Sequence, residues 1–139
     1  MKPTLVTAAV IMDFEGRILL GKRKDSGLYG PPGGKLDDGE LLKAGCAREL
    51  YEESGIRVEQ HDLIELGFCE RTDKHQLVFW YWATLYRGMA RNMEPEKCEG
   101  WKFMEVPADE ECIPGLRLFK YKLMGVLRNV SGIPAKMVA

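Results

Sequence analysis

The chain has 139 residues, of which 45% are hydrophobic and 29% charged, a composition typical of one globular domain with its own core. The formal net charge of −1 gives no general attraction to a nucleic-acid polymer or to an anionic membrane. No apolar run approaches the length of a membrane span. We therefore expect neither a membrane nor a nucleic-acid polymer as a partner.

The first half of the chain alternates strands and turns before a helix. Residues 4–12 and 17–24 are rich in aliphatic side chains and are joined by a short link, which predicts a strand–turn–strand unit. Residues 25–34 hold four glycines and two prolines, which predicts a structured loop. Residues 40–54 contain no proline and end before Gly55, which predicts a helix closed by a glycine.

The second half predicts more strands and a second helix. In order, we expect a strand region over 56–70 with a polar break at 59–62, a long strand over 75–86, a polar loop over 89–100, a short strand over 101–106 and a helix over 113–130. Residues 131–139 are expected to be a loose tail. This order indicates an α/β fold with a mixed sheet packed between helices.

Three carboxylates crowd the end of the first predicted helix. At about 100° per residue, Glu49, Glu52 and Glu53 point into one arc of about 100°. Glu49 and Glu53 repel each other, whereas Arg48 and Glu52 form an i,i+4 pair of opposite charge. One interpretation is a solvated helix face with a salt bridge. The other is a site for a hard divalent cation such as Mg²⁺, which prefers oxygen ligands.

Residues 34–56 follow a fixed pattern: G, five residues, E, seven residues, then R-E-aliphatic-x-E-E-x-G-aliphatic. The matching positions are Gly34, Glu40, Arg48, Glu49, Leu50, Glu52, Glu53, Gly55 and Ile56. This pattern resembles the box of the Nudix hydrolase family. The resemblance implies the family's α/β/α sandwich, with a mixed β-sheet between helices, as a single domain over residues 1–139. It also implies an enzyme that cleaves a nucleoside diphosphate linked to another group, with Mg²⁺ or Mn²⁺ as cofactor.

The resemblance also implies a role for each box residue. Glu52 and Glu53 would be metal ligands, and Glu49 would be either a third ligand or the base that orients water. The carbonyl of Gly33 would be a backbone ligand. Structural roles, which tie the loop to the helix, would fall to Gly34, Glu40, Arg48 and Gly55.

Basic residues near the box are candidates for binding substrate phosphates. Arg23, at the end of the second predicted strand, matches the family position that presents an arginine to phosphates. A solvated strand end is the alternative for this residue. Lys35, beside the glycine pair, is the second candidate.

The loop over 89–100 resembles a segment of MutT-type nucleotide-pool enzymes, in which a glutamate completes the metal site. Glu96 is the first choice for this ligand, Glu99 the second and Glu94 the third. The alternative is a plain polar loop beside the strand that follows it.

Sequence features that are absent from the chain narrow the range of expected substrates. No proline lies between Pro32 and Pro95, where the ADP-ribose group usually carries one, and the NADH and diadenosine polyphosphate motifs are missing. What remains resembles a pyrophosphatase that converts a nucleoside triphosphate, such as 8-oxo-dGTP, into a monophosphate and pyrophosphate. Pro31 stands where MutT-like enzymes often carry a bulky residue, so Tyr29 would stack on the base instead. Phe119 is a candidate wall of the base pocket.

Two other functions stay open. One is Nudix hydrolysis of another diphosphate compound, such as a nucleotide sugar, dihydroneopterin triphosphate or an isoprenoid diphosphate. The other is a non-catalytic nucleotide-sensing module, which would be expected to lose box carboxylates. The expected partner is a small-molecule nucleotide, and the sequence leaves both a monomer and a homodimer open.

The cysteines and histidines argue against a zinc site. No CxxC pair occurs among the four cysteines, which are Cys46, Cys69, Cys98 and Cys112. The two histidines lack the spacing of zinc ligands. We therefore expect reduced thiols in a cytoplasmic protein.

Overall fold

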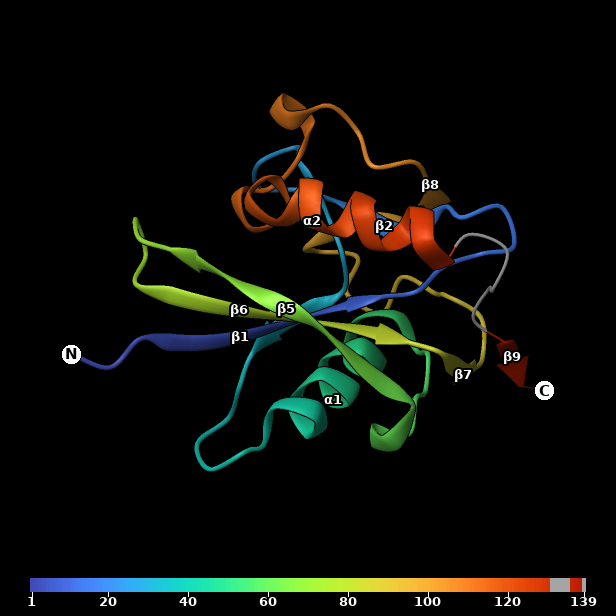
Figure 1. Ribbon diagram of the computed structural model, residues 1–139, viewed down its shortest axis with the longest axis horizontal. Helices are drawn as coiled ribbons and strands as arrows, with labels where there is room; N and C mark the ends of the chain where they lie inside the picture. The colour runs from blue at the N-terminus through green and yellow to red at the C-terminus, as the bar shows by residue number, and fades with distance from the viewer. Residues whose placement is uncertain (131–135, 139) are drawn as a thin grey trace.

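The computed structural model describes residues 1–130 and 136–138 of the chain. A central sheet carries helix α1 (Leu42–Ser54) on one face and helix α2 (Pro114–Val130) on the other (Figure 1). This arrangement confirms the predicted α/β fold with a mixed sheet between two helices. The N-terminus and strand β9 (Lys136–Val138) lie at opposite ends of the view.

The central sheet has four strands in the order β4-β1-β6-β5. Their bounds are Thr4–Val10 for β1, Gly33–Lys35 for β4, Leu63–Arg71 for β5 and Gln76–Ala83 for β6. Strands β1 and β6 are parallel, whereas β4 and β5 join the sheet antiparallel to their neighbours. The register of β1 places the glycine pair of β4 opposite its residues Thr7 and Ala8.

Three further strands form an antiparallel sheet in the order β3-β2-β8. Their bounds are Ile18–Arg23 for β2, Tyr29–Gly30 for β3 and Cys98–Met104 for β8. This sheet brings Arg23, at the end of β2, opposite Cys98, at the start of β8. The loop that precedes β8 therefore lies beside the end of β2.

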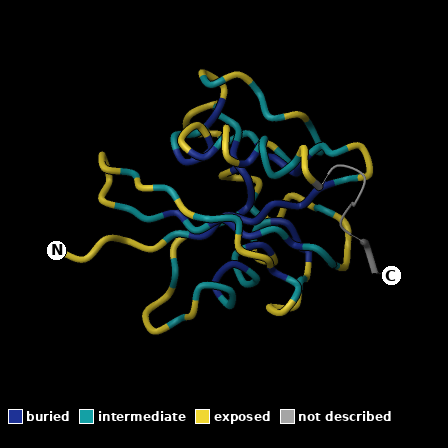
Figure 2. Tube along the Cα trace, viewed as in Figure 1, coloured by how far each residue is buried: buried dark blue, intermediate teal, exposed yellow. Residues whose placement is uncertain are grey.

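Two apolar clusters fill the two sides of the central sheet. Successive side chains of a strand point to opposite faces, so Trp80 of β6 joins Leu116 and Phe119 of α2, whereas Tyr81 joins Leu50 of α1. Figure 2 shows the buried chain concentrated between the helices and the sheet. Burial of each large apolar side chain contributes about 1.5–3 kcal/mol.

Helix α1 begins at Leu42, two residues after the predicted start at Glu40. Glu40 stays in the loop because its carboxylate accepts hydrogen bonds from the Asp37 N–H and from the Arg48 side chain. These hydrogen bonds hold Glu40 in the loop, so the helix begins after this residue. The helix ends before Gly55, as the sequence predicts.

The end of the chain and the long strand also differ in detail from the prediction. The predicted strand over 75–86 is divided at Thr84, whose N–H and hydroxyl both donate to the Asp62 carbonyl. After this break, β7 (Leu85–Arg87) pairs in parallel with β9 (Lys136–Val138), which lies within the tail predicted to be loose. The rest of that tail, 131–135 and 139, lies outside the described residues.

The described residues contain no helix long and apolar enough to cross a membrane. All four cysteines are free thiols, as the sequence predicts. Burial raises the pKa of Cys46 to about 12, so this thiol is inert at neutral pH.

Candidate active site

The Glu53 carboxylate lies where the end of helix α1 meets the glycine loop. Its Oε1 accepts a hydrogen bond of 2.6 Å from the Gly33 N–H. The Trp101 Nε1 donates to the Glu53 carbonyl at 3.0 Å, and Gly55 ends the helix with a φ of 76°, which favours glycine. Burial raises the pKa of Glu53 to about 7, although the Gly33 bond and the charge of Arg23 act in the opposite direction.

Arg48 ties the glycine loop to the helix through Glu40. Its Nε and Nη2 donate to the two Glu40 oxygens at 2.7 and 2.9 Å, a geometry that makes an ion pair strong and specific. Nη2 also donates to the Lys35 carbonyl at 3.1 Å, and Nη1 donates to Glu49 and Glu52 at 3.1 Å. The hydrogen bonds from Arg48 hold the pKa of Glu40 at about 2. Arg48 and Glu40 thus form a frame around the helix carboxylates.

Gly34 lets the Glu49 carboxylate lie directly against β4. A Cβ atom at Gly34 would lie 2.5 Å from the Glu49 Cδ and 2.6 Å from its Oε2. A Cβ atom at Gly33 would collide with the Thr7 carbonyl of β1. Gly33 is therefore required by close packing against the β1 backbone, whereas a side chain at position 34 would displace the Glu49 carboxylate.

Glu94, from the loop before β8, faces the helix carboxylates. Burial raises the pKa of Glu49 and of Glu53, and the negative charge of Glu94 raises both further. Glu94, Glu53 and Arg23 line the same small cavity. Three carboxylates and one arginine therefore converge from helix α1, strand β2 and this loop.

The donor atoms of this cluster suit a hard divalent cation. Within the described residues, no three His, Cys, Asp or Glu side chains are gathered closely enough to hold an ion as they stand; Arg48 and a backbone N–H engage two of the carboxylates. Glu49, Glu53 and Glu94 nevertheless repel one another, and a cation between them would remove that repulsion. Carboxylate oxygens are the ligands that Mg²⁺ and Mn²⁺ prefer. The residues present fit such an ion.

A cavity of about 210 Å³ lies next to the glycine pair, between the central sheet and the start of α2. Three basic residues line it, namely Arg23, Lys35 and Arg71, and no acidic residue of the described chain does. We call it the basic cavity. Arg23 also lines the small cavity of Glu53 and Glu94, so it connects the basic cavity with the carboxylates.

Other residues proposed from the sequence lie outside these cavities. Tyr29 lies under Lys102, whose Nζ is 5.5 Å from the ring centroid, and it lines neither cavity. Phe119 is buried and stacks on Trp80, with ring centroids 4.7 Å apart. It therefore contacts a residue that lines the basic cavity without lining the cavity itself. Glu52 is 50% exposed and is bonded to Arg48 on the outer side of the helix.

The three loop glutamates differ in position. Glu96, the first choice from sequence, is exposed and has no ion pair among the described residues. Glu99 lies 4.0 Å from the Lys22 Nζ, away from the carboxylate cluster. Glu94, the third choice, is the loop glutamate that lines a cavity with Glu53. The geometry therefore favours Glu94 as the loop ligand.

Sequence reasoning missed three residues of the site. Arg71 ends β5 and Gln76 begins β6, and the register places them opposite each other at the basic cavity. The only signal for Arg71 is a basic residue at a strand end. The sequence gives no signal for Trp101, because the hydrogen bond from its indole to the Glu53 carbonyl joins residues 48 positions apart.

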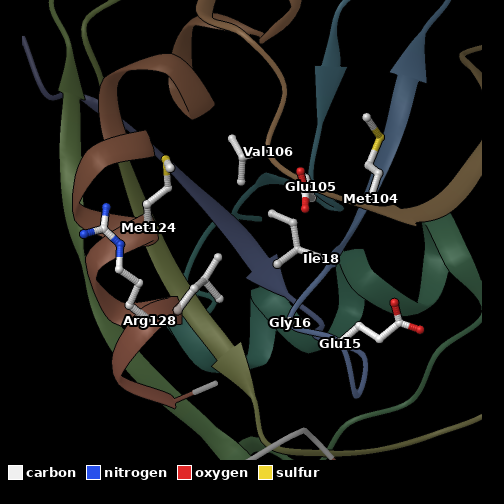
Figure 3. A pocket seen from close by; sticks show the side chains of 9 residues that line it. Glu15, Gly16, Ile18, Met104, Glu105, Val106, Met124 and Arg128 are labelled. Atoms are coloured by element: carbon white, nitrogen blue, oxygen red, sulfur yellow. The ribbon is translucent and has the colours of Figure 1, made fainter. Parts of the chain in front are cut away.

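A larger cavity lies away from this site. It has a volume of about 400 Å³ and is lined mainly by apolar side chains between β2, β8 and the second half of α2. Figure 3 shows Met124 approaching it from the helix and Ile18, Met104 and Val106 from the other side. None of the box carboxylates lines it, so we do not assign the chemistry to this cavity.

Comparisons with known proteins agree with the fold and the box. A family model described as NUDIX domain matches residues 2–118. A crystal structure of a MutT NUDIX hydrolase from Burkholderia pseudomallei superposes with a TM-score of 0.77 and 29% identity, over 91% of this chain and 99% of that one.

Three named relatives are similar over shorter segments. A MutT-like protein of Streptomyces ambofaciens is 45% identical over 56 residues, 40% of this chain and 36% of the relative. An RNA pyrophosphohydrolase of Novosphingobium aromaticivorans is 32% identical over 88 residues, 57% and 52% of the two chains. An 8-oxo-dGTP diphosphatase of Proteus vulgaris is 30% identical over 86 residues, 59% and 77%. The match thus spans about half or less of the length of the first two relatives.

The family-model match extends from β1 to the start of α2. It includes helix α1, which carries Glu49, Glu52 and Glu53, and all the residues that line the basic cavity. Because the family model spans most of the chain and the fold matches a MutT NUDIX hydrolase over almost its whole length, the chain belongs to the NUDIX domain family.

Proposed function

We propose that the chain is a metal-dependent pyrophosphohydrolase that converts a nucleoside triphosphate into a nucleoside monophosphate and pyrophosphate. The observation that carries this proposal is the convergence of Glu49, Glu53 and Glu94 beside Arg23, next to a basic cavity. Phosphoryl transfer depends on positioning and on charge neutralisation. Carboxylates that share a cation, beside side chains that bind phosphate oxygens, supply both.

The positions of the two cavities indicate how the substrate would be oriented in the site. The basic cavity would take the nucleoside, and the polyphosphate would pass Arg23 to reach the carboxylate cluster. Lys35, at the exposed end of β4, lines the same path and would contact phosphate oxygens. The scissile bond would then lie beside Glu53.

Glu53 and Glu94 would hold a Mg²⁺ or Mn²⁺ ion, which would supply positive charge against the phosphoryl oxygens. Glu52 and the Gly33 carbonyl stay additional predicted ligands. Glu49 Oε1 is bonded to Arg48, whereas its Oε2 has no hydrogen-bond donor among the described residues. We assign Oε2 as the atom that accepts a proton from the attacking water, with Arg48 keeping the carboxylate oriented.

An oxidised nucleotide such as 8-oxo-dGTP is the first candidate substrate, since a relative that covers 59% of this chain bears that name. Hydrolysis of a nucleotide sugar, dihydroneopterin triphosphate or an isoprenoid diphosphate is the alternative within the same chemistry. A non-catalytic sensing module is disfavoured because every box carboxylate is present. The four free thiols support a cytoplasmic setting for the reaction.

A substrate panel with Mg²⁺ and with Mn²⁺ tests the proposal. Phosphate and pyrophosphate release would be measured separately for nucleoside triphosphates, 8-oxo-dGTP, nucleotide sugars and ADP-ribose. We expect pyrophosphate from triphosphates, and a loss of about 10²–10⁴-fold in turnover for Glu49→Gln, with unchanged thermal unfolding as the check on folding. AMP released from ADP-ribose while triphosphates stay intact would overturn the proposal.

A further inference from the structure

The carbonyl oxygens at the end of helix α1 bind the loop that carries Glu94. The last carbonyls of a helix have no partner within the helix itself. Here the Ser54 carbonyl accepts a hydrogen bond of 2.8 Å from the Arg91 N–H. The Glu53 carbonyl accepts one of 3.3 Å from the Met93 N–H. Since Met93 directly precedes Glu94, the second of these bonds fixes the chain one residue before Glu94.

The Glu53 carbonyl has a second donor on the other side of the loop. The Trp101 Nε1 donates to it at 3.0 Å, and a carbonyl oxygen has two lone pairs that can accept two such bonds. Trp101 lies in strand β8, after Glu94, whereas Met93 lies before Glu94. One carbonyl oxygen of helix α1 therefore holds the chain on both sides of Glu94.

Strand β2 holds the indole of Trp101 in place. The register pairs Trp101 with Gly21, and a Cβ atom at Gly21 would lie 2.8 Å from two ring carbons of the indole. The absence of a side chain at Gly21 therefore lets the ring contact the β2 backbone directly. Trp101 is partly buried and lines the small cavity with Glu53 and Glu94. The indole N–H thus reaches the helix from a ring that cannot shift toward β2.

The loop itself has no regular secondary structure that would hold Glu94. Residues 88–97 contain bends and turns but no helix or strand. A turn follows Glu94, whose carbonyl accepts hydrogen bonds from the Lys97 and Cys98 N–H groups at 2.9 and 3.1 Å. Glu53, by contrast, lies within helix α1, whose own backbone hydrogen bonds keep it in place. Loss of the indole bond would therefore move the loop and Glu94 more than it moves Glu53.

We propose that Trp101 is a positioning residue for the cation site: its hydrogen bond to the Glu53 carbonyl keeps Glu94 beside the Glu53 carboxylate, so that the two can share a divalent cation. This inference rests on the proposed function, because it takes Glu53 and Glu94 as ligands of that cation. Groups that orient metal ligands affect metal affinity although they do not touch the ion. Trp101 acts in this way, through Glu94.

Calorimetric titration with Mn²⁺ tests the proposal without measuring turnover. Trp101→Phe keeps a ring against Gly21 and removes the N–H, so it should weaken Mn²⁺ binding by about 3- to 10-fold. Trp82→Phe is the matched control, because the Trp82 N–H has no hydrogen-bond partner among the described residues and the side chain lines neither cavity of the site. It should leave the Mn²⁺ affinity unchanged. Thermal unfolding shows whether each variant is folded.

A double-mutant cycle separates positioning from a general loss of structure. If Trp101 acts through Glu94, Trp101→Phe should change the Mn²⁺ affinity of a Glu94→Gln variant by less than about 2-fold. The proposal would be overturned by an unchanged Mn²⁺ affinity in Trp101→Phe, or by an equally large loss in the Glu94→Gln background or in Trp82→Phe. Absence of Mn²⁺ binding to the wild type would overturn it as well.

Should Trp101→Phe fail to fold, hydrogen exchange of the indole N–H groups, measured by NMR, decides with the wild type. Coupling between two equilibria is reciprocal, so saturating Mg²⁺ should slow exchange at Trp101 by about 3- to 10-fold more than at Trp82. Equal effects of Mg²⁺ on the two indoles would contradict the inference. Since neither experiment measures turnover, a failure of triphosphate hydrolysis would reject the proposed reaction separately from this result.

Discussion

Arg48 and Glu40 form a two-pronged ion pair that joins the glycine loop to helix α1, with N–O distances of 2.7 and 2.9 Å. Their side chains are 26% and 15% exposed, so both charges are largely shielded from water. The same guanidinium donates to Glu49 at 3.1 Å. The position of the carboxylate cluster therefore depends on an ion pair formed outside it.

Glu40→Gln should lower the free energy of unfolding near neutral pH by about 1–3 kcal/mol, because Arg48 loses its charged partner. The pKa of Glu40 is about 2 in the folded chain, against an ordinary value of 4.5. A carboxyl group with a lowered pKa contributes stability above its ordinary pKa, and this contribution is lost as the pH falls toward the folded value. The difference between wild type and variant should therefore shrink between about pH 6 and about pH 3 in urea unfolding.

Glu96→Gln is the control for this experiment. Glu96 is exposed and has no ion pair among the described residues, so its loss should change stability by less than about 0.5 kcal/mol at each pH. A deficit in Glu40→Gln that stays the same across this pH range would show that its ionisation does not stabilise the fold.

Local patterns in the sequence predict most of the fold. Aliphatic runs predict β1 and β2, the aromatic run predicts β6, and the stripe of apolar residues predicts α2. These elements follow from neighbouring side chains that bury one face. The start of α1 is harder to predict from the sequence, because it depends on hydrogen bonds from Asp37 and Arg48 to Glu40 rather than on helix propensity.

Contacts between distant segments explain where the structure differs from the prediction made from the sequence. Strand β9 forms by pairing with β7, about 50 residues earlier, and no local pattern reports that pairing. The box glutamates could be assigned to one helix face by periodicity alone. The choice between Glu94 and Glu96 could not, because it depends on how the loop turns beside β2 and α1.

Gly34→Ala should reduce turnover strongly while leaving most of the fold in place. The added Cβ would lie 2.5 Å from the Glu49 Cδ, so the carboxylate must move away from β4 and from its bond with Arg48. Misplacement of a catalytic group by about 1 Å can cost about 10²-fold in rate. Steady-state kinetics with a triphosphate would measure the loss, and thermal unfolding would show that the chain is still folded.

Gly125→Ala is the matched control for that variant. A Cβ atom there meets nothing within 4 Å, and Gly125 lies inside helix α2. Alanine should therefore stabilise the helix by about 0.5–1 kcal/mol without changing turnover. A similar loss of activity in both variants would contradict the role of the Gly34–Glu49 contact.

Arg23→Gln should raise KM for triphosphates, because Arg23 lies between the basic cavity and the carboxylates. Its loss removes a charge that attracts phosphate oxygens, so the effect should be larger at low ionic strength than at high. Lys24→Gln removes a charge at the next residue, which lines neither cavity, and should leave KM nearly unchanged. Equal KM values for Arg23→Gln and wild type at low salt would exclude Arg23 from phosphate binding.

Glu94→Gln and Glu96→Gln separate the two candidate loop ligands. Glu94 lines the cavity of Glu53 and raises the pKa of both helix glutamates, whereas Glu96 is exposed. Glu94→Gln should weaken Mn²⁺ binding by at least about 10-fold and slow turnover, and Glu96→Gln should change neither. Calorimetric Mn²⁺ titration measures binding without depending on turnover. The reverse pattern would make Glu96 the loop ligand instead of Glu94. The loop would then have to rearrange when the ion binds, so that Glu96 reaches the carboxylate cluster.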